Sequence, residues 1–213
     1  KRTAKRAKED KEPKVGTSAL ALAETPTRFH VERFSKGPQL VIPSASSEKR
    51  KFIPIGFEPA ETLCSNLVFI ALNASLYDFG ILNSTMHMAW VRYTCGRLKS
   101  DFRYSKDIVY NNYPWPSTPT EKQREAIESA AQGMLDARAA FPNSTLSDLY
   151  GAVMPPLLVK AHISLDRAVD NAYATNNLKS DSDRVAFLFE QYQSMTSLLP
   201  IVKAKNRQLK VPV

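Results

Sequence analysis

Short apolar runs alternate with polar loops in the first half of the chain, a pattern typical of a small β-sheet. Residues 39–43 form one such run, which a proline ends, and residues 51–57 form a second. The polar, mixed-charge loop 44–50 between them predicts a hairpin and is a good place for recognition. A third run, 67–72, is continuously apolar, which predicts a strand buried on both faces. Residues 29–31 are a shorter strand candidate.

Residues 76–96 carry apolar side chains at near-helical spacing, which predicts a long helix. Asn83 and Ser84 interrupt this pattern and predict either a break or a second start. Gly96 stands where a helix could end. The Met and aromatic residues of this stripe predict packing in a core, and not contact with a cofactor.

The stretch 96–116 joins a basic, polar first half to a β-branched and aromatic second half, which a Pro-Trp-Pro sequence ends. If residues 98–104 are extended, alternate side chains share a face. Lys99, Asp101 and Arg103 would then project from one face of this strand. Such a row is either a set of groups that reads base edges or a solvated edge strand with guard charges.

The rest of the chain is predicted to be helical as far as residue 200. Helix starts are expected at residues 118–121, 144–150, 155–156 and 180–183. The first has the spacing of a capping box, with Pro119 at the first helical position. Apolar residues recur along one side of each longer helix. The helices therefore predict a small bundle.

These patterns predict an α+β fold. The first part is a small mixed β-sheet with a packed long helix, and an all-α helical bundle follows it. The expected boundaries are a basic linker at 1–24, a sheet domain at 25–117, a helical domain at 118–200 and a polar tail at 201–213. The chain does not begin with Met, so we interpret it as a piece of a larger protein.

The net charge of +8 is unevenly distributed. Residues 1–117 carry 18 Lys and Arg against 11 Asp and Glu, and residues 118–213 carry 11 against 10. The basic excess in the first half predicts a polyanionic partner there. Two cysteines without CxxC spacing and three scattered histidines predict neither a disulfide nor a zinc site, which fits the cytoplasm. No apolar run is long enough to span a membrane.

Sequence motifs of catalysis are missing. The seven glycines never form GxG, and neither GxSxG nor HExxH occurs. We therefore expect no catalytic residue, no cofactor site and no metal site in these residues. A stand-alone enzyme is disfavoured for the same reason.

Five motifs occur in an order that resembles one known family. They are SEKRKFIPIGF at 47–57, LYDFGIL at 76–82, MHMAWVR at 86–92, GRLKSDFRYS at 96–105 and YNNYPWP at 110–116. The series is similar to the C-terminal part of MmeI-type restriction–modification enzymes. Those are large bacterial proteins that join a nuclease, an adenine-N6 DNA methyltransferase that uses S-adenosylmethionine, a target recognition domain and a helical C-terminal domain.

The resemblance implies that this chain is the target recognition domain with the helical C-terminal domain. Its partners would be duplex DNA and the upstream methyltransferase domain. S-adenosylmethionine would bind in that missing domain, and no cofactor would bind here. The whole protein would be an adenine-specific DNA methyltransferase, and the resemblance leaves open whether it is also an endonuclease. The family suggests that the helical domain supports recognition or clamps DNA, and its near-neutral charge favours support.

The resemblance also marks candidate contact residues. Those expected to read bases are Lys99, Asp101 and Arg103, with Glu48 and Arg50 of the loop. Those expected to touch the DNA backbone are Lys49, Lys51, Arg92, Arg97, Ser105 and Lys106. Arg and Lys suit guanine O6 and N7, and Asp accepts from cytosine N4.

Two alternatives of other classes stay open. In a protein-interaction module, the helical bundle would dock a partner and the basic half would be incidental. In an RNA-binding domain, Phe102, Tyr104, Tyr110 and Tyr113 would stack on unpaired bases. Salt-dependent binding of duplex DNA, and competition by single-stranded RNA, distinguish the three.

Overall fold

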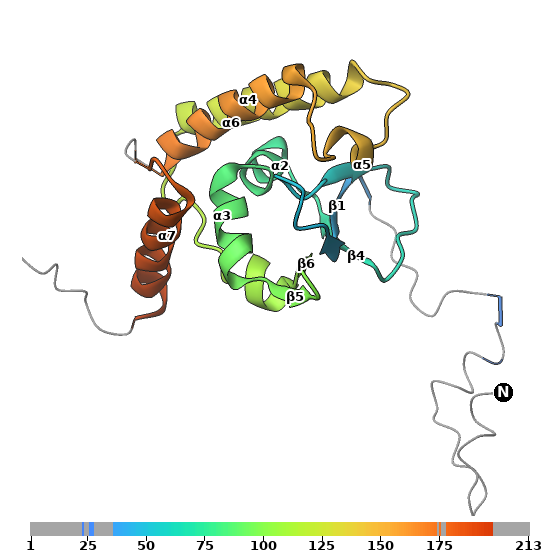
Figure 1. Cartoon of the computed structure of the whole chain (residues 1–213), viewed down its shortest axis with the longest axis horizontal. Coiled ribbons are helices and arrows are strands. Elements are labelled where there is room, and N and C mark those ends of the chain that lie inside the picture. The colour runs from blue at the N-terminus through green and yellow to red at the C-terminus, as the bar shows by residue number, and fades with distance from the viewer. Residues whose placement is uncertain (1–22, 24–25, 28–35, 174, 176–177, 198–213) are drawn as a thin grey trace, which may run out of the picture. The chain divides into compact units, whose positions relative to one another are not determined.

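The computed structural model describes residues 23, 26–27, 36–173, 175 and 178–197. The strand expected at 29–31, most of the basic segment 1–24 and the tail 201–213 lie outside the described residues. The elements below belong to one compact unit, Ser35–Val213. Its two small antiparallel sheets and several helices confirm the α+β class (Figure 1).

The first sheet has β1 (Gln39–Pro43) at its centre, with β3 (Gly56–Glu58) and β4 (Val68–Leu72) on either side. Both pairings are antiparallel, so Leu40 lies between Phe57 and Ala71. The predicted pairing of the first two apolar runs is therefore confirmed, but the second strand is shorter than expected. Phe52, Ile53 and Ile55 are all buried, and Pro54 between them has no backbone N–H to donate to a neighbouring strand.

β4 does not have two buried faces, so that prediction is wrong. Within the described residues β4 pairs only with β1 and lies at an edge of the sheet. Ile70 and Leu72 share one face of the strand and are 37% and 49% exposed. A continuous apolar run does not by itself distinguish a central strand from an edge strand.

The expected long helix is two helices, α2 (Leu76–Leu82) and α3 (Thr85–Thr94). The break falls at Asn83 and Ser84, and the Ser84 hydroxyl caps α3 by accepting from the backbone N–H of His87. Ser75 and Asp78 form a capping box at the start of α2. Phe79, Ile81, Met86 and Trp90 are buried, which confirms that the stripe is core.

The second sheet consists of β2 (Ala45–Ser46), β6 (Asp101–Arg103) and β5 (Gly96–Leu98), in that order. The expected continuous strand over 98–104 is therefore a hairpin. Lys99 lies in its turn with φ 56°, a left-handed conformation that a strand residue does not adopt. After β6 the chain forms a single π-helical turn, η2 (Lys106–Tyr110). Gly96 follows the C-cap of α3 but has no positive φ.

The C-terminal half is helical, as expected. Its helices are α4 (Glu121–Ala139), α5 (Leu146–Leu149), α6 (Pro156–Ala172) and α7 (Asp181–Thr196). The capping box of α4 consists of Thr120 and Gln123, and not of the expected residues 118–121. The helix start expected at 180–183 is confirmed, and Ser180 and Asp183 form a capping box there.

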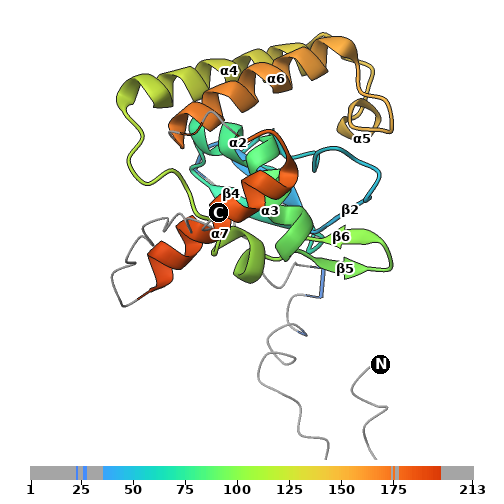
Figure 2. The ribbon, with the colours of Figure 1, turned by 60° about the vertical axis from the view of Figure 1, so that its left-hand side comes forward.

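These helices do not pack as a bundle of their own. The pair α4 and α6 covers α2, while α7 packs on α3 (Figures 1 and 2). Ile127 on α4 and Leu165 on α6 are fully buried next to Gly80 of α2. The helical half and the sheet half therefore share one hydrophobic core. In the described part of the chain, no helix has the length and apolar character needed to cross a membrane.

Candidate nucleic-acid interface

The β5–β6 hairpin presents two charged side chains from one strand face. Asp101 and Arg103 are exposed, and Phe102 between them is 3% exposed because it points into the core. Lys99 is exposed in the adjoining turn. Within the described residues, neither Lys99 nor Arg103 makes a hydrogen bond or an ion pair through its side chain. The arrangement leaves an anionic and a cationic group side by side and accessible.

The loop that follows β2 approaches this hairpin. Ala45 pairs with Arg103 in the sheet. The backbone N–H of Glu48 donates to Oδ1 of Asp101 at 3.3 Å. The candidate residues of the loop and those of the hairpin, about fifty residues apart in sequence, therefore lie close together in the fold (Figure 2).

Arg50 of the same loop points elsewhere. Its Nη2 donates to the hydroxyl oxygen of Ser147 on α5 at 2.6 Å. A guanidinium group held in this way must break a hydrogen bond to reach a base. The structure therefore ties Arg50 to the C-terminal helices and leaves Glu48 exposed on the loop.

Arg92 and Arg97 are already occupied by partners inside the protein. Arg92 forms an ion pair with Asp181 at 2.5 Å and donates to the carbonyl oxygen of Lys51 at 2.9 Å. Arg97 lies 4.1 Å from the centre of the Phe102 ring and donates to the carbonyl oxygen of Ser100 at 2.9 Å. We therefore expect both side chains to stabilise the hairpin and the neighbouring loop rather than to contact a phosphate.

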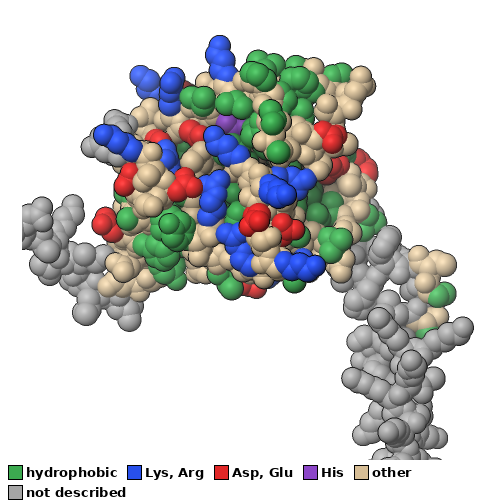
Figure 3. All heavy atoms as spheres, in the orientation of Figure 1, with side chains coloured by type: hydrophobic (Ala, Val, Ile, Leu, Met, Phe, Trp, Pro, Cys, Tyr) green, Lys and Arg blue, Asp and Glu red, His purple; other side chains and the backbone are tan. Residues whose placement is uncertain are grey.

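The remaining backbone candidates differ in how available they are. Lys49 and Lys51 are exposed, and the Lys51 ammonium lies 5.5 Å from the centre of the Phe52 ring. Lys106 is exposed and pairs loosely with the neighbouring Asp107 at 3.3 Å. The Ser105 hydroxyl caps η2 by accepting from the N–H of Ile108. Figure 3 shows Lys and Arg side chains gathered over the middle of the face that carries α3 and the hairpin.

Three of the four aromatic residues proposed to stack on RNA bases are in the core. Phe102, Tyr104 and Tyr113 are between 1% and 3% exposed, and only Tyr110 is partly exposed. Tyr104 and Tyr113 pack their rings around His87. The prediction of a stacking platform from these residues is wrong, because ring faces buried in a core cannot meet a base.

A buried polar network joins the two halves, and the sequence analysis missed it. Arg138 on α4 is 8% exposed and donates to the Ile55 carbonyl oxygen at 2.8 Å and to Asn83 Oδ1 at 3.1 Å. It also donates twice to the Tyr150 hydroxyl oxygen, at 2.6 and 3.0 Å. That hydroxyl lies 2.8 Å from Nε2 of His162 on α6.

A signal for this network was present in the sequence. Arg138 follows Met134 by four residues and so continues the apolar stripe of α4. His162 follows Leu158 by four residues in the same way on α6. A polar residue on an apolar stripe predicts a buried, hydrogen-bonded group.

The buried histidines are held neutral by their surroundings. Burial lowers the pKa of His87 to about 4, although the Leu82 carbonyl oxygen at 2.8 Å from Nδ1 opposes that shift. Burial, reinforced by the positive charge of Arg138, lowers the pKa of His162 to about 3. Both rings are therefore in the neutral form near pH 7.

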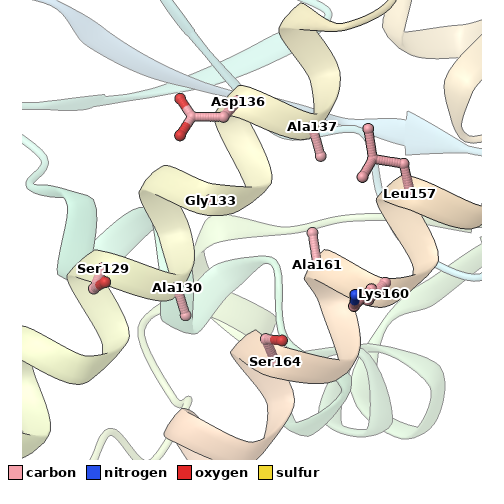
Figure 4. Close-up of a pocket in the computed structure, with 9 residues that line it drawn as sticks. All are labelled: Ser129, Ala130, Gly133, Asp136, Ala137, Leu157, Lys160, Ala161 and Ser164. Atoms are coloured by element: carbon pink, nitrogen blue, oxygen red, sulfur yellow. The ribbon is translucent and has the colours of Figure 1, made fainter.

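No catalytic constellation is found in the part of the chain that the structure describes. Its His, Cys, Asp and Glu residues form no group of three that could hold a metal ion. A cavity of about 520 Å³ lies between α4 and α6 and is lined mainly by small side chains, with Asp136 and Lys160 as its charged residues (Figure 4). It contains no pair of converging titratable groups.

Comparison with known proteins gives two family matches along the chain. The model of the MmeI target recognition domain matches residues 2–117, and the model of the MmeI C-terminal domain matches residues 119–200. The chain is 41% identical over 188 residues to DNA methyltransferase A of Bacillus subtilis (strain 168), which covers 88% of this chain and 21% of that protein.

Comparison with solved structures also gives a match to MmeI. The Type IIL restriction–modification enzyme MmeI, in complex with DNA, is 44% identical and superposes with a TM-score of 0.80. The match covers 86% of this chain and 25% of the MmeI chain. This chain thus spans about a fifth to a quarter of the length of these two relatives.

Proposed function

This chain belongs to the MmeI family, as a target recognition domain followed by a C-terminal domain, and from that premise we propose that it holds duplex DNA for an adenine-N6 methyltransferase domain of a longer protein. Methylation of adenine N6 requires that the base leave the helix. The duplex must first be held at a chosen sequence. Side chains on phosphates fix its position, and side chains on base edges select the sequence.

The observation that carries the proposal is the exposed Asp101–Arg103 pair beside the loop at 47–51. Arg103 has the two parallel donors that match guanine O6 and N7, and the Asp101 carboxylate can accept from cytosine N4. Residues two apart on a strand are separated by about 7 Å. That distance is about two steps of a DNA strand, at roughly 3.4 Å a step.

The exposed lysines supply the backbone contacts in this proposal. In the part of the chain that the structure describes, Lys49, Lys99 and Lys106 have no buried partner, and Lys51 has only the Phe52 ring, 5.5 Å from its ammonium. Arg92 and Arg97 serve instead to hold the hairpin and its neighbouring loop. The relatives' names support this function, because one is a DNA methyltransferase and the other is an enzyme solved with DNA.

The rest of the reaction belongs to other parts of the longer protein in this proposal. S-adenosylmethionine binds in the methyltransferase domain and supplies the methyl group there. We assign the protein to the bacterial cytoplasm, where its DNA substrate is. The contribution of this chain is to bind, orient and select the duplex.

Fluorescence anisotropy of the chain with a labelled mixed-sequence duplex tests the proposal. Affinity should fall steeply between about 50 and 200 mM salt, because phosphate contacts release counterions. Arg103→Ala should weaken binding, and Arg167→Ala, which removes an exposed arginine of α6, is the matched control. Single-stranded RNA should compete poorly.

Two results would contradict the proposal. Absence of duplex binding by the folded chain at low salt would favour the protein-interaction module. Preferential competition by single-stranded RNA would favour the RNA-binding alternative, although the stacking residues first considered for it are buried.

A further inference from the structure

The loop at residues 47–55 connects the candidate base-reading hairpin to the C-terminal helices. It leaves β2 directly after Ser46, which pairs with Phe102 of β6. At its other end it enters β3. Its first residues therefore lie beside Asp101, and its last residues lie against the helical half (Figure 2).

Four contacts connect this loop to the C-terminal helices, three of them directly and one through α3. Arg50 donates to Ser147 of α5 at 2.6 Å, and the Phe52 ring stacks on His162 of α6 with 3.9 Å between ring centres. The Ile55 carbonyl oxygen accepts from Arg138 of α4 at 2.8 Å.

The fourth contact runs through α3. Arg92 donates to the Lys51 carbonyl oxygen at 2.9 Å, and its guanidinium is itself paired with Asp181 at the start of α7. The four helices that the structure describes after Pro116 therefore all contribute to the position of one nine-residue loop.

The Arg138 contact is a rigid one. Its guanidinium is buried, and within the described residues no carboxylate lies at ion-pair distance. Its charge is met by the oxygen atoms of Ile55, Asn83 and Tyr150 and by the faces of two aromatic rings. A protein is strongly destabilised when a buried cation loses such partners. The Ile55 end of the loop is therefore held firmly by Arg138.

The other end of the loop acts on Asp101. The Glu48 N–H donates to Oδ1 of Asp101, and the second carboxylate oxygen has no hydrogen-bond donor in the described part of the protein. An exposed aspartate normally samples several rotamers. A backbone donor on one oxygen favours one rotamer and so decides where the second oxygen lies.

We propose that the C-terminal helices determine base preference at the position read by Asp101, because they hold loop 47–55 and so place the Glu48 N–H. This inference rests on the proposed function and adds a role for the helical half within it. In it, Ser147 and Arg138 are positioning residues that act through the loop. They do not touch DNA.

The test is selection from a pool of duplexes with a randomised segment, followed by sequencing of the bound fraction. The wild-type chain should show preferences at several positions. Asp101→Asn should weaken the preference at one of them by about fivefold or more. Ser147→Ala and Arg138→Lys should weaken the preference at that same position by about two- to thirtyfold, with the other positions and the salt slope unchanged.

Lys160→Ala, which removes an exposed lysine of α6, is the matched control and should leave every position unchanged. Near-ultraviolet circular dichroism checks that each variant is folded. Ser147→Ala removes only one exposed hydroxyl group and is expected to fold. The test can therefore be made with this variant alone if Arg138→Lys does not fold.

The outcomes separate this inference from the proposed function. A wild-type chain without any sequence preference would overturn the proposed function. A wild-type preference that Asp101→Asn alters, but that Ser147→Ala and Arg138→Lys leave intact, would overturn only the role of the helices. Loss at all positions together would also overturn it, because that result indicates general loosening.

Discussion

The carboxylate of Asp166 on α6 accepts two hydrogen bonds from Thr85, one from its backbone N–H at 2.7 Å and one from its hydroxyl at 2.6 Å. Thr85 is the first residue of α3, so the negative charge lies at the positive end of that helix. The pair joins the helical half to the sheet half through groups 81 residues apart. It is therefore a further point, besides Arg138, at which the two halves are fixed together.

The first prediction concerns this pair. Asp166→Asn should lower the free energy of unfolding by about 1–3 kcal/mol, because a charge-assisted acceptor is lost at a partly buried site. Thr85→Val should lower it less, since the backbone N–H remains. A double-mutant cycle by urea unfolding should give a coupling of about 0.5–3 kcal/mol.

Asp136→Asn is the control for this cycle, because that carboxylate is exposed on α4. It should change stability by no more than about 0.5 kcal/mol. Strict additivity of the Asp166 and Thr85 variants would contradict the direct contact.

The second prediction concerns the two buried histidines. The pKa of His87 is lowered to about 4 and that of His162 to about 3, chiefly by burial. Between pH 6.5 and 4 the unfolded chain therefore binds more protons than the folded chain. The free energy of unfolding should fall as the pH falls through this range, by up to about 1.4 kcal/mol per pH unit for each histidine.

Urea unfolding at several pH values measures this dependence, with His87→Gln as the comparison. The variant removes one titrating group, so its stability should change less steeply below pH 6.5. Equal slopes for wild type and His87→Gln would show that His87 is not held neutral.

The third prediction compares two glycines. A Cβ atom on Gly80 of α2 would lie 2.7 Å from Ile127 Cγ2 on α4, whereas a Cβ atom on Gly133 meets nothing within 4 Å. Gly80→Ala should therefore destabilise the protein by about 1–3 kcal/mol through overpacking. Gly133→Ala should stabilise it by about 0.5–1 kcal/mol, because alanine favours the helix interior.

Thermal unfolding of the two variants checks this pair. Opposite shifts of the melting temperature are expected. A Gly80→Ala variant as stable as the wild type would mean that α2 and α4 do not pack as closely as described.

Local patterns predicted most of the elements. The strand at 39–43, the break at Asn83–Ser84 and the helix start at 180–183 each depend on neighbours in sequence, and the structure confirms them. The continuous strand at 98–104 was wrong because one residue, Lys99, adopts a left-handed conformation that no periodicity reveals. The packing of α4 on α2 and of α7 on α3 was not predicted, because helical periodicity shows which side of a helix is apolar but not which element covers it.

The segments that form the candidate site were predictable from the sequence, but the contacts between them were not. The sequence shows that segments 44–50 and 96–106 are polar and charged, and the structure brings Glu48 and Asp101 of these segments together. It could not show that Arg92 and Arg97 have partners, because Asp181 and Phe102 reach them only in the folded chain. The roles of the individual residues in DNA binding stay predictions.

The last prediction concerns Lys49, which is exposed on the loop and makes no side-chain hydrogen bond or ion pair within the described residues. If its ammonium neutralises one phosphate, Lys49→Ala should reduce the slope of log affinity against log salt by about 0.9. It should weaken the binding of all duplexes about equally, since phosphate contacts carry no sequence information.

Arg97→Lys should behave differently. The variant loses the contacts with the Phe102 ring and the Ser100 carbonyl oxygen, so the hairpin is held less firmly. Sequence preference should therefore decrease, with little change in the slope of log affinity against log salt. Anisotropy titrations at several salt concentrations measure both, with Lys122→Ala on α4 as the control. An unchanged slope for Lys49→Ala would remove Lys49 from the interface, and a reduced slope with intact preference for Arg97→Lys would return Arg97 to the phosphate-binding set.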